Sequence, residues 1–436
     1  MLYTPQSPWL DPAEQRELVE RLLEWGLIKF SNRRDLPLKS GGKTDVYMNL
    51  RDARNHPDAI AFIARMFENP LRRLTPGRFI EVSDAMSCFA GPLSIATGIP
   101  YLTIREQAKE GRVAKARSIG STPFGSTGVI IDDVVTDGAS KIVPFREAVG
   151  MGIKVRDLVV LVDREQGWRQ KFTEQGIDLS VWPGMTLHDV RRLLIRDLGV
   201  MERCDPETEK KNPLIVALDG KSWDETRAIA DALRPSGCIL KVNDLLFDEG
   251  IARLIPNLHV YGRVMADLKS HDIPNTATNT CRRLRKDPPW AVTVHASGSG
   301  EMVRAAVKAL EGTPTNVLAI TVLTSLDPVT CEEIYRRLPL EQVRVLAKIA
   351  SDAGAHGFVC SPEEARELKS TYPGKTIVTP GIRSEATPKD DQARIATPKG
   401  AMEAGADYLV VGRQILGASD PVAEVRRVMT DELGIA

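Results

Sequence analysis

The chain has 436 residues, 42% of them hydrophobic, and its 58 lysines and arginines balance 58 aspartates and glutamates. This length exceeds what one hydrophobic core usually serves, and the neutral balance excludes a general nucleic-acid-binding or acidic-tail protein. The six cysteines show no C-x-x-C spacing, and no apolar run approaches the roughly 20 residues that cross a membrane. We therefore expect a two-domain cytoplasmic enzyme that acts on small molecules and binds neither nucleic acid nor membrane.

The first half of the chain carries five β-like runs separated by helix-like sequence. Such an alternation predicts an α/β domain built on a doubly wound, Rossmann-like parallel sheet. The runs cover residues 78–84, 101–106, 128–134, 157–163 and 178–182.

The third run leads into the motif GVIIDDVVTDGAS (128–140), in which a strand ends at two carboxylates and a loop that opens a helix. Backbone N–H groups, hydroxyls and a helix N-terminus together suit a phosphate. Asp132 and Asp133 cannot bind a phosphate directly, but they suit sugar hydroxyls, Mg²⁺ or a developing cationic sugar centre. The motif thus predicts a ribose phosphate site, and a capped helix start is the alternative interpretation.

This strand, both acids and the loop resemble the phosphoribosyl pyrophosphate (PRPP) loop of type I phosphoribosyltransferases. The segments 38–51, 162–167 and 105–111 resemble the substrate segments and the mobile loop of orotate phosphoribosyltransferase, except that the mobile loop lacks one lysine and the histidine. The resemblance implies transfer of phosphoribose to orotate, with Mg²⁺ bound through PRPP rather than by direct protein ligands, and with Lys109 as the catalytic lysine. It implies substrate binding by Lys39, Tyr47, Arg105, Asp132, Asp133, Thr136, Asp137, Gly138, Ala139, Ser140 and Arg164.

The stretch MERCDPETEKKNP (201–213) is charged, contains two prolines and has almost nothing to bury. We therefore expect a first domain over 1–200, a linker over 201–212 and a second domain over 213–436.

Eight short apolar runs follow this boundary, each succeeded by helix-like sequence. Eight strand–helix units are the count of a (β/α)8 TIM barrel, whose catalytic face lies at the carboxyl ends of the strands. The runs cover residues 214–219, 238–242, 263–269, 291–296, 318–324, 357–361, 376–382 and 408–413.

The third of these runs ends in Asp267 and Lys269, and Asp272 follows in a turn that contains a proline. A strand has a period of two, so Asp267 and Lys269 share a face, and we expect Asp272 to converge with them. The alternative interpretation, which assigns these residues no function, is a surface salt-bridge cluster on a loop. Similarly, Asp219 could merely cap the following helix. His295 is more simply explained as a structural histidine whose hydrogen bonds are satisfied at a strand end than as a catalytic residue.

Residues 213–430 resemble orotidine 5′-phosphate decarboxylase along nearly their whole length, through DLKSHDIPNT, TVLTSL, GFVCSPEE, VTPGIR, DDQARIATP and VVGR in the family's order. The resemblance implies cofactor-free conversion of orotidine 5′-phosphate (OMP) to UMP and CO2. Lys269 would donate the proton to C6, and Asp267 would lie beside the substrate carboxylate. The implied catalytic residues are Lys241, Asp267, Lys269 and Asp272, and the implied substrate-binding residues are Asp219, Ile273, Thr276, Ser325, Arg383, Gln392, Gly412 and Arg413.

Family analogy places Asp272, Ile273 and Thr276 in the active site of a neighbouring subunit, which implies a homodimer or higher homo-oligomer. The order of transferase and then decarboxylase resembles that of bifunctional UMP synthases, whose partners would be orotate, PRPP, OMP and UMP. Two alternatives stay open. The first domain could be a non-catalytic PRPP-binding module, because its mobile loop is altered, and the barrel could be a Mg²⁺-dependent sugar-phosphate lyase.

Overall fold

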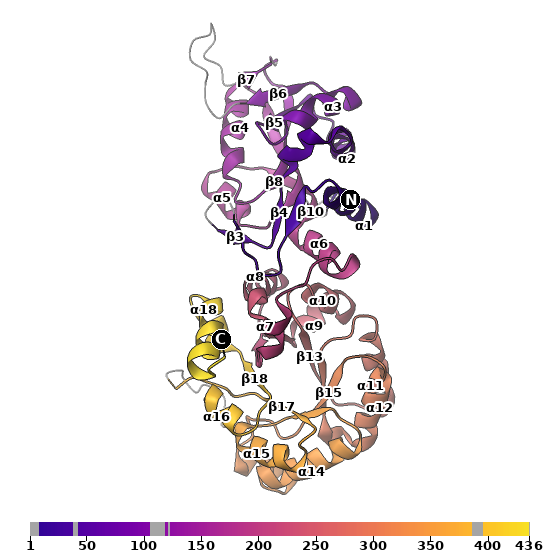
Figure 1. Ribbon diagram of the computed structural model, residues 1–436, viewed down its shortest axis with the longest axis vertical. Coiled ribbons are helices and arrows are strands. Elements are labelled where there is room, and N and C mark those ends of the chain that lie inside the picture. The colour runs from indigo at the N-terminus through magenta and orange to yellow at the C-terminus, as the bar shows by residue number, and fades with distance from the viewer. Residues whose placement is uncertain (1–7, 38–41, 105–117, 121–122, 386–395, 436) are drawn as a thin grey trace. The chain divides into compact units, whose positions relative to one another are not determined.

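The computed structural model describes residues 8–37, 42–104, 118–120, 123–385 and 396–435 (Figure 1). The chain divides into two compact units, residues 1–201 and 202–436. Within the described ranges, no helix has both the length and the apolar character needed to cross a bilayer.

The first unit is built on a six-stranded sheet with the strand order β10-β9-β8-β5-β6-β7. All neighbouring strands are parallel except the β6–β7 pair, so the expected doubly wound parallel sheet is present with one added antiparallel edge strand. The strands are β5 (Arg78–Val82), β6 (Tyr101–Ile104), β7 (Ser118–Ile119), β8 (Thr127–Val135), β9 (Lys154–Asp163) and β10 (Ser180–Thr186).

Helices cover both faces of this sheet because its strands are apolar on both sides. Phe79 and Ile131 pack into one buried cluster with side chains of α1, α2 and α3, whereas Ile80 and Ile130 pack into another with α4 and α5. The helical segments are α1 (Pro12–Glu24), η1 (Leu50–Asn55), α2 (Pro57–Leu74), α3 (Ser87–Thr97), α4 (Ala139–Gly150), α5 (Trp168–Glu174), α6 (Leu187–Arg192) and η2 (Leu193–Asp197).

Two short antiparallel pairs precede the sheet and were not predicted from the sequence. They join β1 (Ile28–Phe30) to β4 (Val46–Met48), and β2 (Leu36–Pro37) to β3 (Lys43–Thr44). Strands of two or three residues carry no periodic signal, so sequence patterning does not reveal them.

The second unit is a closed barrel of eight parallel strands, which confirms the predicted architecture. Its last strand pairs with its first, with Leu409 opposite Leu214. The strands are β11 (Leu214–Ala217), β12 (Ile239–Val242), β13 (Val264–Ser270), β14 (Ala291–His295), β15 (Asn316–Ile320), β16 (Gly357–Val359), β17 (Thr376–Thr379) and β18 (Tyr408–Val411).

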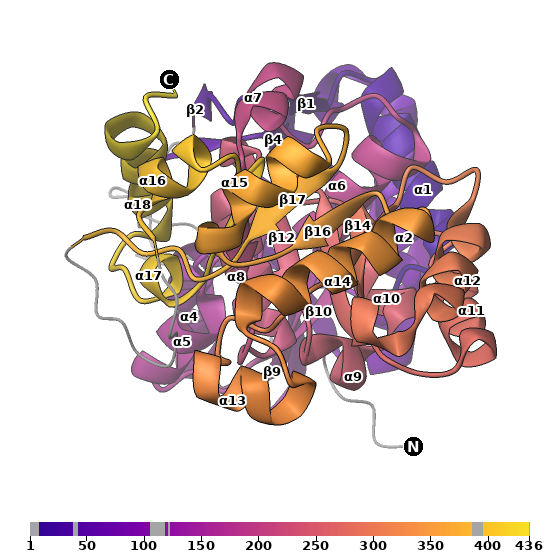
Figure 2. The same ribbon diagram turned by 90° about the horizontal axis from the view of Figure 1, so that it is seen from below.

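Helices surround the barrel, and α14 and α15 lie outside it beside β16 and β17 (Figure 2). Inside, Ile215, Ile239, Met265 and Leu318 belong to one buried apolar cluster that fills the barrel. The helical segments are α7 (Pro206–Lys211), α8 (Trp223–Leu233), η3 (Arg234–Ser236), α9 (Leu245–Glu249), α10 (Ile251–Leu258), α11 (Pro274–Arg283), η4 (Ala296–Gly298), α12 (Gly300–Leu310), α13 (Pro328–Tyr335), α14 (Pro339–Asp352), α15 (Pro362–Thr371), α16 (Pro398–Glu403), α17 (Arg413–Leu416), α18 (Pro421–Arg427) and η5 (Val428–Glu432).

The segment expected to be a linker is structured and belongs mostly to the second unit. The Asp205 carboxylate caps α7 by accepting the backbone N–H of Glu207 at 3.0 Å. Glu209 in that helix pairs with Arg203 at 2.6 Å and with Arg263 at 3.4 Å. Ion pairs between charged side chains, rather than burial of apolar ones, therefore stabilise this segment.

Candidate active site

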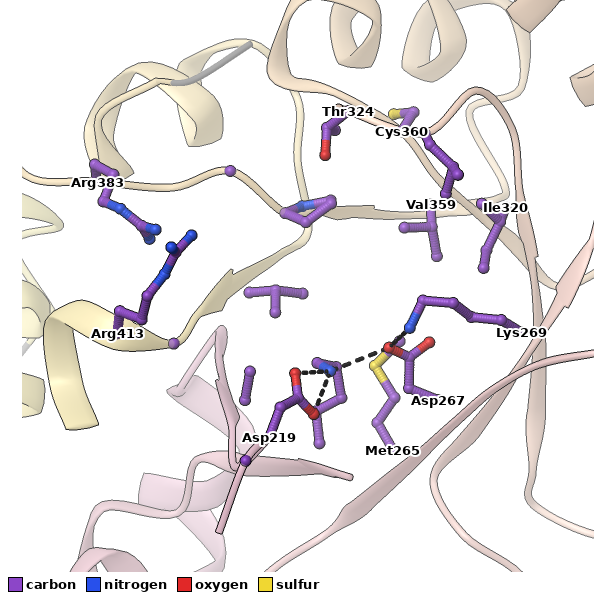
Figure 3. A pocket seen from close by; sticks show the side chains of 18 of the residues that line it. Asp219, Met265, Asp267, Lys269, Ile320, Thr324, Val359, Cys360, Arg383 and Arg413 are labelled. Atoms are coloured by element: carbon purple, nitrogen blue, oxygen red, sulfur yellow. Dashed lines mark hydrogen bonds and ion pairs between the residues drawn. The ribbon is translucent and has the colours of Figure 1, made fainter. Parts of the chain in front are cut away.

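A cavity of about 560 Å³ opens at the carboxyl ends of the barrel strands (Figure 3). Its lining follows from the strand period of two. Residue 215 of β11 and residue 239 of β12 point into the apolar core, so Ala217, Asp219 and Lys241 come next along the same inward rows. In β13, Met265 is followed in the same way by Asp267. The sequence thus places charged side chains directly above an apolar layer.

Four charged side chains form a chain of contacts across one wall of the cavity. The Lys241 ammonium donates to Asp219 at 2.7 Å and to Asp267 at 3.1 Å, and Lys269 donates to the same oxygen of Asp267 (Figure 3). The side chains of Lys241 and Asp267 are only 7% and 8% exposed, whereas that of Lys269 is 41% exposed. Lys269, and Asp219 with 47% of its side chain exposed, are therefore the members of this array that are open to a ligand.

Both buried members of the array are charged at neutral pH. Burial alone would raise the pKa of Asp267, but Lys241 and Lys269 outweigh it and hold that pKa below its usual value. Burial likewise favours a lower pKa for Lys241, yet Asp267 and Asp219 raise it above the ordinary value. The two lysines and two aspartates balance, so an anionic ligand group placed among them meets fixed charges of both signs.

Strand β13 is irregular where it carries Lys269. The register of the β13–β14 ladder shifts between Ala266 and Ser270, and Lys269 adopts a left-handed backbone with φ +47°. A residue with a side chain costs about 1–3 kcal/mol in such a conformation and keeps it only where neighbours enforce it. Here the Thr293 hydroxyl accepts the Lys269 N–H at 2.9 Å and donates to the Asp267 carboxylate at 2.8 Å.

Two arginines lie elsewhere on the cavity wall. Arg383 follows β17, Arg413 begins α17, and Figure 3 shows their guanidinium groups turned toward each other. Guanidinium groups match the oxygens of a phosphate in geometry and charge, so this pair suits a phosphate dianion. Gly412 lines the cavity beside them, and Gln392 lies outside the described residues.

Asp272 does not line the cavity that holds Asp267 and Lys269 of the same chain. Asp272 is exposed, and its carboxylate accepts the N–H of Ile273 at 2.6 Å. It lies between the end of β13 at Ser270 and the start of α11 at Pro274. Ile273 is 64% exposed and Thr276 is half-buried in α11, and neither belongs to the cavity lining.

Ser325 also differs from its expected place. It is exposed in the loop after β15, and Leu323 and Thr324 line the cavity instead. Because β15 already ends at Ile320, the strand period gives no guide to side-chain direction five residues later. Thr293, in contrast, was missed although a signal existed, since it is the one polar residue of the strand AVTVH before the final histidine.

In the first unit, strand β8 continues through both predicted acids to Val135, so Asp132 and Asp133 point to opposite faces of the sheet. Asp132 is buried and pairs with Lys141 of α4, which sequence reasoning missed. Lys141 also donates to the Ser140 hydroxyl at 2.8 Å. Burial and the neighbouring Asp132 raise the pKa of Asp133 to about 8.

The loop after these acids opens helix α4, as the motif predicts. Gly138 has φ +79°, and a Cβ there would lie 2.5 Å from the ring of Phe172, so this position requires glycine. Asp137 accepts the N–H of Ala139 at 3.1 Å and pairs with Lys171 at 2.5 Å. Thr136 and Ser140 are exposed on either side. The loop therefore supplies an acceptor for the first N–H group of α4, and the hydroxyl side chains on either side of it are exposed.

The remaining predicted residues of the first unit are only partly described. Arg164 is buried and donates to the Thr44 hydroxyl at 2.8 Å, and Tyr47 is half-buried opposite Lys29 in the β1–β4 pair. Arg164 therefore contacts the same hairpin region that carries Tyr47. Lys39, Arg105 and Lys109 lie outside the described residues.

Comparisons with known proteins concern the second unit. Residues 212–428 match the model of the orotidine 5′-phosphate decarboxylase / HUMPS family. The chain is 41% identical over 229 residues to a Pseudomonas aeruginosa protein named orotidine 5′-phosphate decarboxylase, covering 51% of this chain and 98% of that protein. A protein of the same name from Chromobacterium violaceum is 41% identical over 231 residues, covering 52% of this chain and 93% of that protein.

Among solved structures, orotidine 5′-phosphate decarboxylase from Lactobacillus acidophilus is 38% identical, with a TM-score of 0.44, covering 50% of this chain and 97% of that one. The residues that match the family model, like the length of chain aligned with the curated relatives, correspond to the barrel that holds the charged array. The chain belongs, through this barrel, to the orotidine 5′-phosphate decarboxylase / HUMPS family.

Proposed function

We propose that the barrel decarboxylates orotidine 5′-phosphate to UMP and CO2 without a cofactor. The observation that carries the proposal is the Lys241–Asp267–Lys269 array on a cavity that also holds two facing arginines. The names of the curated relatives support the same reaction. In this arrangement Arg383 and Arg413 hold the 5′-phosphate, Asp219 binds the ribose, and Asp267 and Lys269 face the reacting carbon.

The chemistry follows from the fixed charges. A substrate carboxylate about 4 Å from the Asp267 carboxylate is repelled by about 4 kcal/mol at an effective dielectric near 20. That repulsion disappears when neutral CO2 leaves, so it lowers the barrier to C–C cleavage. The carbanion left at C6 lies beside the Lys269 ammonium, which stabilises it and then donates a proton to it. Phosphate contacts remote from C6 supply the binding energy that holds the carboxylate against Asp267.

The test is turnover of OMP by the purified chain, followed by ultraviolet absorbance with UMP resolved by chromatography. We expect full activity after EDTA treatment, and loss of activity on EDTA would favour the Mg²⁺-dependent sugar-phosphate lyase instead. Lys269→Ala should be inactive. Lys348→Ala is the matched control, because it removes a 72% exposed lysine that pairs with Asp352 one turn further along α14.

We further propose that the first unit is an orotate phosphoribosyltransferase, so that the whole chain acts as a bifunctional UMP synthase. The parallel sheet, the acids at the end of β8 and the glycine loop into α4 support this proposal. The loop N–H groups and hydroxyls would hold phosphate, and Asp133 would face the ribose. Mg²⁺ would arrive bound to PRPP and shield the pyrophosphate charge.

One incubation separates this proposal from its alternative, a non-catalytic PRPP-binding module. The chain is given orotate, PRPP and Mg²⁺, and OMP and UMP are resolved by chromatography. Formation of UMP supports both activities, since the product of the transferase is the substrate of the decarboxylase. Rapid decarboxylation of supplied OMP without any loss of orotate would support the non-catalytic module.

We also propose that a second copy of the chain completes each barrel site. The exposed positions of Asp272 and Ile273 suit residues that reach into a neighbour. Mixing Lys269→Ala with Asp272→Ala chains should restore activity, because a hybrid dimer contains one site with neither substitution. Complementation should be absent when each variant is assayed alone, and its absence from the mixture would contradict a shared site.

A further inference from the structure

The two segments that carry the facing arginines are fastened together by one amide side chain. Ser384 follows Arg383, and Gln414 follows Arg413 along the chain. The Ser384 backbone N–H donates to the Gln414 Oε1 at 2.9 Å, and the Gln414 Nε2 donates to the Ser384 hydroxyl at 2.6 Å. Neither Ser384 nor Gln414 lines the cavity, whereas both arginines do. These hydrogen bonds therefore act on the arginines through the backbone.

Charged side chains from the last helices anchor this fastening. Gln414 Nε2 also donates to Glu424 of α18 at 2.7 Å, and Arg427 donates to the Ser384 hydroxyl at 2.8 Å. Arg427 in turn bonds Glu424 at 2.8 and 2.9 Å and Glu432 at 2.8 Å, and Glu432 contacts Ser384. Charge-assisted bonds of this kind are stronger than neutral ones. The anchor is thus a connected network rather than a single contact.

We infer that Gln414 is a positioning residue that sets the spacing of Arg383 and Arg413 before a phosphate binds. The inference rests on the proposed function, in which this pair holds the 5′-phosphate. Without this tether the segments that carry the two arginines can take a range of separations. A ligand then has to bring them together, and the ordering cost lowers its affinity. Gln414 removes that cost in advance.

The test compares Gln414→Met with the unchanged chain. Methionine keeps the length of the side chain but cannot make these hydrogen bonds, and losing them should weaken UMP binding about tenfold. Calorimetry should show this loss for UMP but no change for uridine, which lacks the phosphate. For OMP, kcat/KM should fall about tenfold as well. Arg427→Met leaves Gln414 in place and should shift UMP binding in the same direction by a smaller factor.

Gln342→Met is the matched control. Gln342 is a buried glutamine of α14 that accepts a hydrogen bond from Arg337 at 3.3 Å, and it does not line the cavity. This control should bind UMP as the unchanged chain does. Equal UMP affinity in Gln414→Met and the unchanged chain would overturn the inference, and so would an equal loss for UMP and uridine.

Failure of the proposed function gives a different result. If the unchanged chain does not turn over OMP, binding of inorganic phosphate alone still reports on the arginine pair. Weaker phosphate binding by Gln414→Met than by Gln342→Met then supports the positioning role without the reaction. Identical phosphate binding by these two variants contradicts it.

Discussion

Replacing Thr293 with valine tests whether the shape of β13 is needed for catalysis. Valine has nearly the same volume as threonine, so the change leaves no cavity, but it replaces the hydroxyl with a methyl group that cannot hydrogen-bond. The Asp267 carboxylate loses a donor at 2.8 Å, and the Lys269 N–H loses its acceptor at 2.9 Å. A bond to a charged group contributes about 1.5–3 kcal/mol, and a neutral bond about 0.5–1.5 kcal/mol.

The total loss is therefore about 2–4.5 kcal/mol, divided between the stability of the barrel and the transition state. If about half of it falls on the transition state, about 1–2 kcal/mol, kcat for OMP decreases by about 5- to 50-fold. We expect a lower denaturant midpoint for the barrel together with this loss. Thr293→Ser keeps the hydroxyl and should recover most of kcat.

Thr226→Val is the matched control for this prediction. Thr226 is also fully buried in the barrel unit, but its hydroxyl has no hydrogen-bond partner among the described residues. The same chemical change there should leave kcat unaltered and should not lower stability. A Thr293→Val enzyme with unchanged kcat would refute the role of this hydroxyl, and equal losses in Thr293→Val and Thr293→Ser would show that packing is responsible.

Three further outcomes are expected. Lys269→Ala should abolish decarboxylation and leave orotate consumption intact in separate assays of the two steps, and loss of both in a folded chain would mean that the units depend on each other. Asp132→Asn combined with Asp133→Asn should abolish orotate consumption and leave decarboxylation of supplied OMP intact. If orotate consumption is retained, these acids are not part of the transferase site. The pKa of Asp133 is raised from 3.8 to about 8, so the folded first unit keeps a proton that the unfolded chain releases. Its stability should therefore fall as pH rises from about 4 to about 8, and Asp133→Asn should reduce this fall in urea titrations at several pH values.

The sequence predicted the strands of both units well because most of them are continuous apolar runs, which buried parallel strands require. The strand period predicted that Asp267 and Lys269 share a face, and they do contact each other, although through an irregular stretch of β13 in which Lys269 is left-handed. The place of Lys241 in the array was implied by the family resemblance, and Lys241 contacts Asp267. Asp272 and Ser325 lie beyond the ends of their strands, where the period no longer indicates the direction of a side chain, and their roles in the site stay predictions.

Contacts made across the fold were not accessible to sequence reasoning. The Asp132–Lys141 pair joins a strand to the helix after it, and the Ser384–Gln414 bonds join residues 30 positions apart. Neither pair has a spacing that distinguishes it from other polar residues nearby. The left-handed backbone of Lys269 likewise depends on a hydroxyl from the next strand rather than on any local preference.

The closure of β18 onto β11 determines when the protein can first work during its synthesis. The lysines and aspartates come from the first three strands of the barrel, whereas the two arginines follow the last two. A nascent chain that stops before residue 408 lacks Arg413 and the strand that closes the barrel. We therefore expect chains that end before this strand to be inactive, and the appearance of decarboxylase activity in a translation reaction would then mark the completion of β18.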